Sequence, residues 1–169
     1  MTQDKRIDKL VQELTNFENK KFVYYRWSGT QFTPTHFRLS IGITELQQSQ
    51  LRAMALPSDY IDLLMLTNGI KLFEDINSKS IFAGSLLSFD EVLTNNGFFE
   101  KHRDFVKEGN IPVFQIQDIG LVLINTNKSK DDTIVFVLPD DSEKEMSMYS
   151  FLNEFLLYAG NIPSVSWMD

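Results

Sequence analysis

The chain has 169 residues and no cysteine, which excludes disulfides, thiol nucleophiles and thiolate metal sites. Hydrophobic residues make up 43% and charged residues 23%, a composition that is typical of a globular protein and excludes a mainly disordered chain. The net charge of −7 lies entirely in residues 131–169, which hold eight acidic residues and one lysine, so direct nucleic-acid binding is disfavoured and a basic partner is favoured.

The first predicted elements are a helix and an aromatic strand. Apolar residues recur at helical spacing from Ile7 onward and predict a helix over residues 4–17. The dense aromatic residues of 22–27 predict a strand that Gly29 ends. Trp27 lies in this strand, so we assign it to the core.

Two further helices are predicted from their end signals. Thr44 with Gln47 three residues later is the pattern of a capping box and predicts a helix that ends near residue 55. A second helix is predicted to start at Pro57, with the Ser58 hydroxyl capping its first N–H groups. Gly69 is expected to end it, because glycine adopts a left-handed conformation cheaply.

The remainder is predicted to consist mainly of strands, with a short helix and a final helix. Ser88 with Glu91 repeats the capping-box pattern, and Phe151 with Phe155 forms an i, i+4 pair of a closing helix. The uninterrupted apolar run of 121–124 predicts a strand covered on both faces, and residues 139–142 have turn chemistry. The predicted strands span residues 70–73, 80–82, 111–115, 120–125 and 133–138.

No targeting or membrane segment is recognised. Residues 1–9 are charged and lack the apolar stretch of a signal peptide, and no apolar run reaches membrane-spanning length. We therefore expect a cytoplasmic protein without membrane contact, built as a single domain over residues 1–169 with a C-terminal tail at 161–169.

Catalytic chemistry is poorly supported by the sequence. His36 and His102 stand in no metal-binding or catalytic motif. The acid pairs Glu74-Asp75, Asp131-Asp132 and Asp140-Asp141 could bind a divalent cation or perform acid/base work, but adjacent acids in polar turns are usually solvated. We therefore predict no catalytic residue, no cofactor and no metal.

The acidic segment 131–145 is the main candidate for a partner-binding surface. It carries six acids and one lysine, and either a docking surface or a solubilising turn would account for it. Trp167 could pack back on the domain or contact a partner, because tryptophan supplies a large contact area. The predicted partner-binding residues are Asp131, Asp132, Asp140, Asp141, Glu143, Glu145 and Trp167.

Residues 43–69 resemble the signature of the SUKH superfamily, which includes cell-wall-synthesis regulators and bacterial immunity proteins. The resemblance rests on the segment from Leu56-Pro57 to Tyr60, followed by Thr67-Asn68-Gly69, and it extends over residues 40–158. It implies an α+β fold in which a mixed or antiparallel sheet of about five to six strands packs with about four helices. It supplies no catalytic residues.

Three function classes follow from these observations. The resemblance favours a non-enzymatic immunity protein that occludes a cognate toxin domain, and the localised acidity favours a basic, nuclease-type toxin. The alternative within the same family is a regulatory scaffold of the cell-wall-regulator type. A hydrolase that uses the acid pairs is the third class, and it requires those pairs to line a concave pocket.

Overall fold

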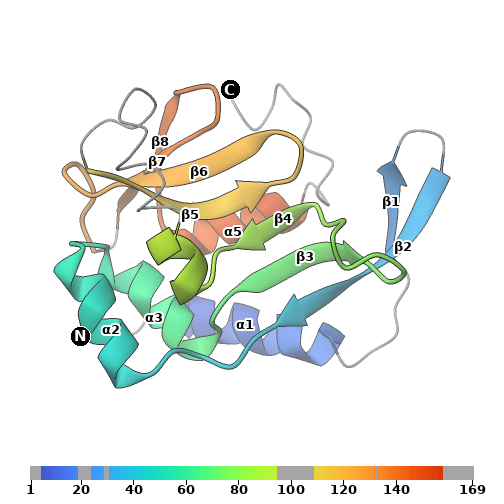
Figure 1. The fold of residues 1–169 in the computed structure, drawn as a ribbon, viewed down its shortest axis with the longest axis horizontal. Helices are drawn as coiled ribbons and strands as arrows, with labels where there is room; N and C mark the ends of the chain where they lie inside the picture. The colour runs from blue at the N-terminus through green and yellow to red at the C-terminus, as the bar shows by residue number, and fades with distance from the viewer. Residues whose placement is uncertain (1–4, 19–23, 29–30, 95–108, 132, 158–169) are drawn as a thin grey trace.

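A computed structural model describes residues 5–18, 24–28, 31–94, 109–131 and 133–157. These residues form an α+β fold around one antiparallel sheet, whose eight strands lie side by side in sequence order (Figure 1). The strands are β1 (Tyr24–Ser28), β2 (Gln31–Leu39), β3 (Ile70–Asp75), β4 (Gly84–Leu86), β5 (Asn110–Ile116), β6 (Gly120–Asn125), β7 (Ile134–Val137) and β8 (Glu143–Met146). The helices with defined bounds are α1 (Lys5–Glu18), α2 (Glu45–Ala53), α3 (Ser58–Leu66) and α5 (Met148–Leu157).

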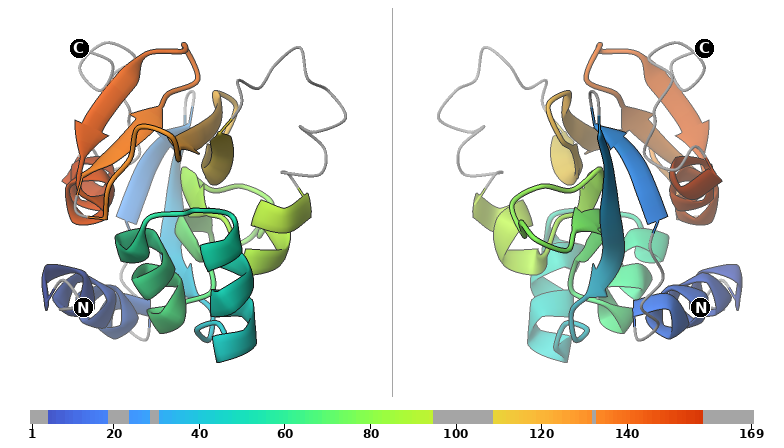
Figure 2. Two further views of the ribbon diagram at one scale, coloured as in Figure 1. Left: turned by 90° about the vertical axis from the view of Figure 1, so that its left-hand side faces the viewer. Right: turned by 90° about the vertical axis from the view of Figure 1, so that its right-hand side faces the viewer.

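The helices cover the two faces of the sheet unequally. Figures 1 and 2 show α1 and α5 on one side, here called the back face, and a short helical stretch over residues 89–94 on the other, here called the front face. The helices α2 and α3 pack on each other beside the sheet. No helix in the described part of the chain is long and apolar enough to cross a membrane.

The back face of the sheet holds the aromatic core. Phe114 on β5 meets Phe151 and Phe155 of α5 edge to face, with ring centroids 5.2 and 5.0 Å apart. Phe155 also packs directly over Gly84, where a Cβ atom would overlap its ring. The predicted i, i+4 pair of the closing helix is therefore confirmed, and both rings serve as core residues.

The front face carries a polar row that the strand register sets. Arg38 on β2 lies opposite Lys71 on β3, which lies opposite Ser85 on β4. Ser85 lies opposite Gln115 on β5, and Gln115 lies opposite Leu121 on β6. Because directly paired residues share a face of the sheet, these five side chains form one row across five strands. The polar row is its first four members, Arg38, Lys71, Ser85 and Gln115, and the row ends at Leu121.

The local end signals predicted several helix ends correctly. The capping box of Thr44 and Gln47 is present. That of Ser88 and Glu91 is present as well: the Ser88 N–H donates to Glu91 Oε2 at 2.8 Å, and the Glu91 N–H donates to Ser88 Oγ at 3.3 Å. The predicted left-handed helix end at Gly69 is wrong, because α3 ends at Leu66 with Thr67 as an extended C-cap residue. Gly69 has a φ of +101° in the turn that leads into β3. The predicted hydroxyl cap at Ser58 is wrong, because the N-cap residue is Pro57 and the Ser58 N–H donates to Asp131 Oδ1 at 3.2 Å.

The mixed or antiparallel sheet that was expected is antiparallel, and the described residues form eight strands instead of about five to six, so two strands were missed. The strand β2 was not predicted, and β8 was not predicted because its sequence, Glu-Lys-Glu-Met, is mostly charged. The strand predicted at 80–82 lies instead at β4, since residues 75–81 form a turn that Asp75 Oδ1 organises by accepting from the N–H groups of Asn77 and Ser78. On β6, Leu121 and Leu123 are only half-buried, so the expected full cover of both faces is wrong.

The surroundings of Asp62, on α3, disfavour the charged form of its carboxyl group. Partial burial raises the pKa of Asp62, Arg52 opposes this shift, and the charges of Asp131 and Asp8 add to it. A carboxyl group with a raised folded-state pKa binds its proton more tightly when folded. It therefore destabilises the fold at neutral pH, and the cost disappears as the pH falls through the folded pKa towards the unfolded one.

We expect Asp62→Asn to raise the midpoint of thermal unfolding slightly at pH 7, by an amount worth a few tenths of a kcal/mol because the group is partly solvated. The gain should vanish near pH 3, where the wild-type carboxyl is already protonated. Thermal melts followed by circular dichroism at both pH values measure this difference. Asp118→Asn, an exposed turn position, is the matched control, and an equal gain in both variants would contradict the assignment.

Candidate functional site

Four of the predicted partner-binding residues gather on the hairpin that joins β7 to β8. This acidic hairpin consists of Asp140, Asp141, Glu143 and Glu145, all of which are exposed. Asp140 Oδ1 accepts from the backbone N–H of Ser142 at 3.0 Å and from its hydroxyl at 2.7 Å, and these bonds lower the pKa of Asp140. Asp141 has a φ of +66°, so the predicted turn at 139–142 is confirmed.

The two glutamates of the acidic hairpin lie on β8, at one end of the strand order. Glu143 pairs with Val137 and Glu145 with Val135, so both side chains share the face of these valines. Lys128 Nζ donates to both carboxylate oxygens of Glu143, at 2.8 and 2.7 Å. Lys128 therefore compensates the charge of Glu143, one of the four acids of the acidic hairpin.

The other predicted partner-binding residues do not join the acidic hairpin. Asp131 lies at the start of α3, where it caps the Ser58 N–H and contributes a favourable negative charge at a helix N-terminus. Asp132 and Trp167, with the tail 161–169, lie outside the described residues. Trp27 occupies β1, opposite Phe32 in the backbone register, and its side chain is likewise outside the described part.

The acid pair Glu74-Asp75 is structural rather than solvated. Glu74 is fully buried and accepts bonds from three nitrogen atoms: Arg38 Nη2 at 2.6 Å, Arg38 Nε at 2.9 Å and His36 Nε2 at 3.0 Å. Arg38 thus grips the carboxylate in a bidentate fashion. The expectation that this pair is a solvated turn is wrong, and His36 serves as a partner of Glu74, while His102 lies outside the described residues.

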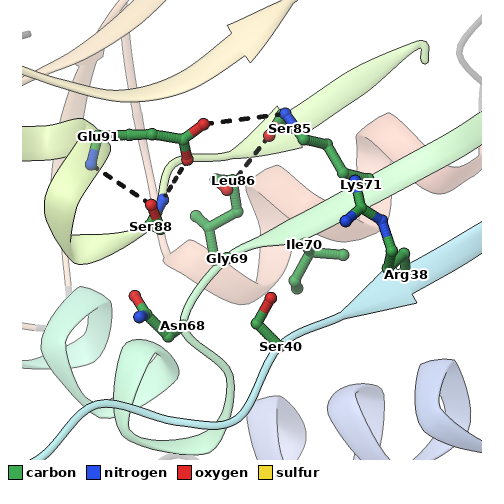
Figure 3. Close-up of a pocket in the computed structure, with 10 residues that line it drawn as sticks. All are labelled: Arg38, Ser40, Asn68, Gly69, Ile70, Lys71, Ser85, Leu86, Ser88 and Glu91. Carbon is green, nitrogen blue, oxygen red and sulfur yellow. Dashed lines mark hydrogen bonds and ion pairs between the residues drawn. The ribbon is translucent and has the colours of Figure 1, made fainter. Parts of the chain in front are cut away.

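A pocket of about 320 Å³ opens on the front face beside the polar row (Figure 3). Its lining comes from β2, β3 and β4, from the loop that ends α3 and from the start of the helical stretch 89–94. None of the three acid pairs lines this pocket, and the described residues contain no group of histidine and acidic side chains that could hold a metal ion. The lining residues are Arg38, Ser40, Asn68, Gly69, Ile70, Lys71, Ser85, Leu86, Ser88 and Glu91.

The sequence did not predict this pocket. Its charged members come from positions 38, 71 and 91, and only the strand register places them together. The one available signal was a polar residue between apolar neighbours in two strands, Lys71 between Ile70 and Leu72 in β3 and Ser85 before Leu86 in β4. Such a residue indicates a strand with one polar face, but it does not reveal which strands are neighbours.

Comparison with known proteins identifies a family for most of this fold. The model of the SMI1 / KNR4 family (SUKH-1) matches residues 43–157, which is more than half of the chain. The match begins just before α2 and runs to the end of α5. No curated protein shows significant similarity to the chain.

Proposed function

Because the chain belongs to the SMI1/KNR4 family (SUKH-1), which includes immunity proteins and is generally non-catalytic, we propose that it is an immunity protein. It would bind the toxin domain of a cognate toxin and occlude its active surface. The predicted resemblance to this family, made from residues 43–69, agrees with the family match. Binding would take place in the cytoplasm and would need no cofactor.

The observation that carries the choice of partner is the acidic hairpin. Four exposed acids lie on the hairpin that ends in β8, at one end of the sheet order, in a chain whose negative charge is concentrated in its last quarter. A nuclease toxin engages phosphate groups and therefore presents a basic surface. Complementary charge would accelerate the encounter of the two proteins, while buried contacts would supply most of the affinity.

The direct test is a pull-down with the product of the adjacent toxin gene, together with rescue of cells that express it. We expect a stable complex and restored growth. Absence of both complex and rescue would rule out the immunity function. A complex without rescue would favour the regulatory scaffold.

Removal of the four charges of the acidic hairpin is expected to slow association about tenfold at low ionic strength, with little change in dissociation. The variant Asp140→Asn, Asp141→Asn, Glu143→Gln, Glu145→Gln preserves the turn, since asparagine can accept the Ser142 bonds and tolerates a positive φ. Association and dissociation rates measured by surface plasmon resonance at two salt concentrations give the result.

The matched control removes four exposed acids elsewhere, at Glu13, Glu45, Asp90 and Asp118. Both variants change the net charge equally, so a difference between them reports the position of the interface and not the total charge. Equal slowing in both variants, or in neither, would place the interface away from the acidic hairpin.

A further inference from the structure

The front-face pocket contains an ammonium group without a hydrogen-bond acceptor. Lys71 is 22% exposed, and its Nζ lies 4.0 Å from Glu91 Oε1 and 4.2 Å from the centroid of the Phe82 ring. Both contacts are electrostatic, and neither is a hydrogen bond. Figure 3 shows the ion pair between Lys71 and Glu91, and within the described part of the chain the three N–H groups of Lys71 make no hydrogen bond.

A second cation of the pocket is held in place from behind. Arg38 uses Nε and Nη2 to bind the buried Glu74, which fixes the plane of its guanidinium group. Its remaining nitrogen, Nη1, makes no hydrogen bond within the described residues. Arg38 and Lys71 are direct neighbours in the strand register, so both side chains leave the sheet on the front face.

One neutral side chain of the pocket, Asn68, adds a donor. Asn68 uses Oδ1 to accept from the Phe89 N–H at 2.7 Å, which directs its remaining hydrogen-bonding capacity to the donor group Nδ2. The acidic member, Glu91, already accepts the Ser88 N–H with Oε2. The donors that face the pocket thus come from Lys71, Arg38 and Asn68, and one oxygen of its only acidic side chain is already engaged.

We propose that this pocket binds a carboxylate group, presented by an aspartate or glutamate side chain of the protein partner. A carboxylate offers only acceptors and can receive bonds from Lys71 and Arg38 together. The assignment to a protein side chain rests on the proposed protein-binding function, whereas carboxylate binding follows from the pocket itself. The partner surface would then be basic where it meets the acidic hairpin and acidic where it enters the pocket.

The test is a titration of the full-length, ¹⁵N-labelled chain with the peptide acetyl-Gly-Glu-Gly-amide, followed by amide chemical shifts. We expect saturable shifts at Gly69, Lys71 and Ser85, with a dissociation constant on the order of millimolar for so small a ligand. The glutamine version of the peptide should give no saturable shift. Equal shifts with both peptides, or none with either, would overturn the proposal, as would binding of inorganic phosphate in place of the glutamate peptide.

Variants of Lys71 separate recognition from a general change of charge. Lys71→Gln should weaken binding of the glutamate peptide about tenfold, the loss expected for one charged hydrogen bond, and Lys71→Arg should retain most of it. Lys79→Gln, at an exposed loop position, is the control with the same charge change and should bind as the wild type does. Equal weakening by Lys71→Gln and Lys79→Gln would overturn the proposal. No toxin enters this experiment, so its outcome is independent of whether the chain neutralises one.

Discussion

Glu74→Gln is expected to lower the free energy of unfolding by about 2–3 kcal/mol, because it removes the charge from a fully buried carboxylate that serves three donors. Glutamine keeps one carbonyl acceptor but places an NH2 group against nitrogen donors. The loss stays below the largest values for buried ion pairs, since Arg38 is 44% exposed and water can solvate its freed guanidinium group.

Urea unfolding at pH 7, followed by circular dichroism, measures this change. Glu145→Gln is the matched control, an exposed glutamate on β8, and should stay within about 0.5 kcal/mol of the wild type. The double variant Arg38→Met, Glu74→Leu should recover part of the stability lost in Glu74→Gln, because it removes both charges together. Wild-type stability in Glu74→Gln would contradict the role of the pair in holding β2 to β3.

The same ion pair shows where reading of the sequence fails. Glu74 stands beside Asp75 and a polar loop, the setting of a solvated acid pair, and only the pairing of β2 with β3 brings Arg38 against it. Asp75 is also buried, but its side chain organises the next turn by accepting from the N–H groups of Asn77 and Ser78. Two neighbouring acids therefore differ in role because strand alternation sends their side chains to different surroundings.

The helix starts also differ in whether the capping residue is near in the sequence or far away. Thr44 with Gln47 could be recognised because both capping partners lie within one turn. The start of α3 could not, since its capping acceptor, Asp131, comes from 73 residues further along the chain. That distant bond gives the exposed Asp131 a capping role that its sequence neighbours did not indicate.

Strand register connects the two candidate binding features. Leu121 and Leu123 both lie on the front face of β6, and Leu123 pairs with Val137, which pairs with Glu143. The pocket cations and the β8 glutamates therefore project from the same face of the sheet, at β2 and β3 on one side and at β8 on the other.

Gly42→Ala is expected to destabilise the protein by on the order of 3 kcal/mol, because a Cβ atom at this position would overlap the backbone carbonyl oxygen of Met65. Met65 lies in the last turn of α3, and flanking bonds hold the two segments together. Ile43 N–H donates to the Leu64 carbonyl at 2.9 Å, and Asn68 N–H donates to the Ile41 carbonyl at 3.3 Å. Backbone cannot rotate away as a side chain would, so relief of the overlap must break at least one of these bonds.

The adjacent substitution Ile41→Ala isolates this effect. Ile41 is 93% exposed, so its truncation should change the unfolding midpoint in urea very little. The turn that follows α3 also supplies Asn68 and Gly69 to the front-face pocket, so Gly42→Ala should weaken binding of the glutamate peptide as well. If Gly42→Ala and Ile41→Ala unfold at the same urea concentration, the close approach of residue 42 to α3 does not determine the packing of this helix. A stable Gly42→Ala variant with weakened peptide binding would instead show that the segment moves and carries the pocket with it.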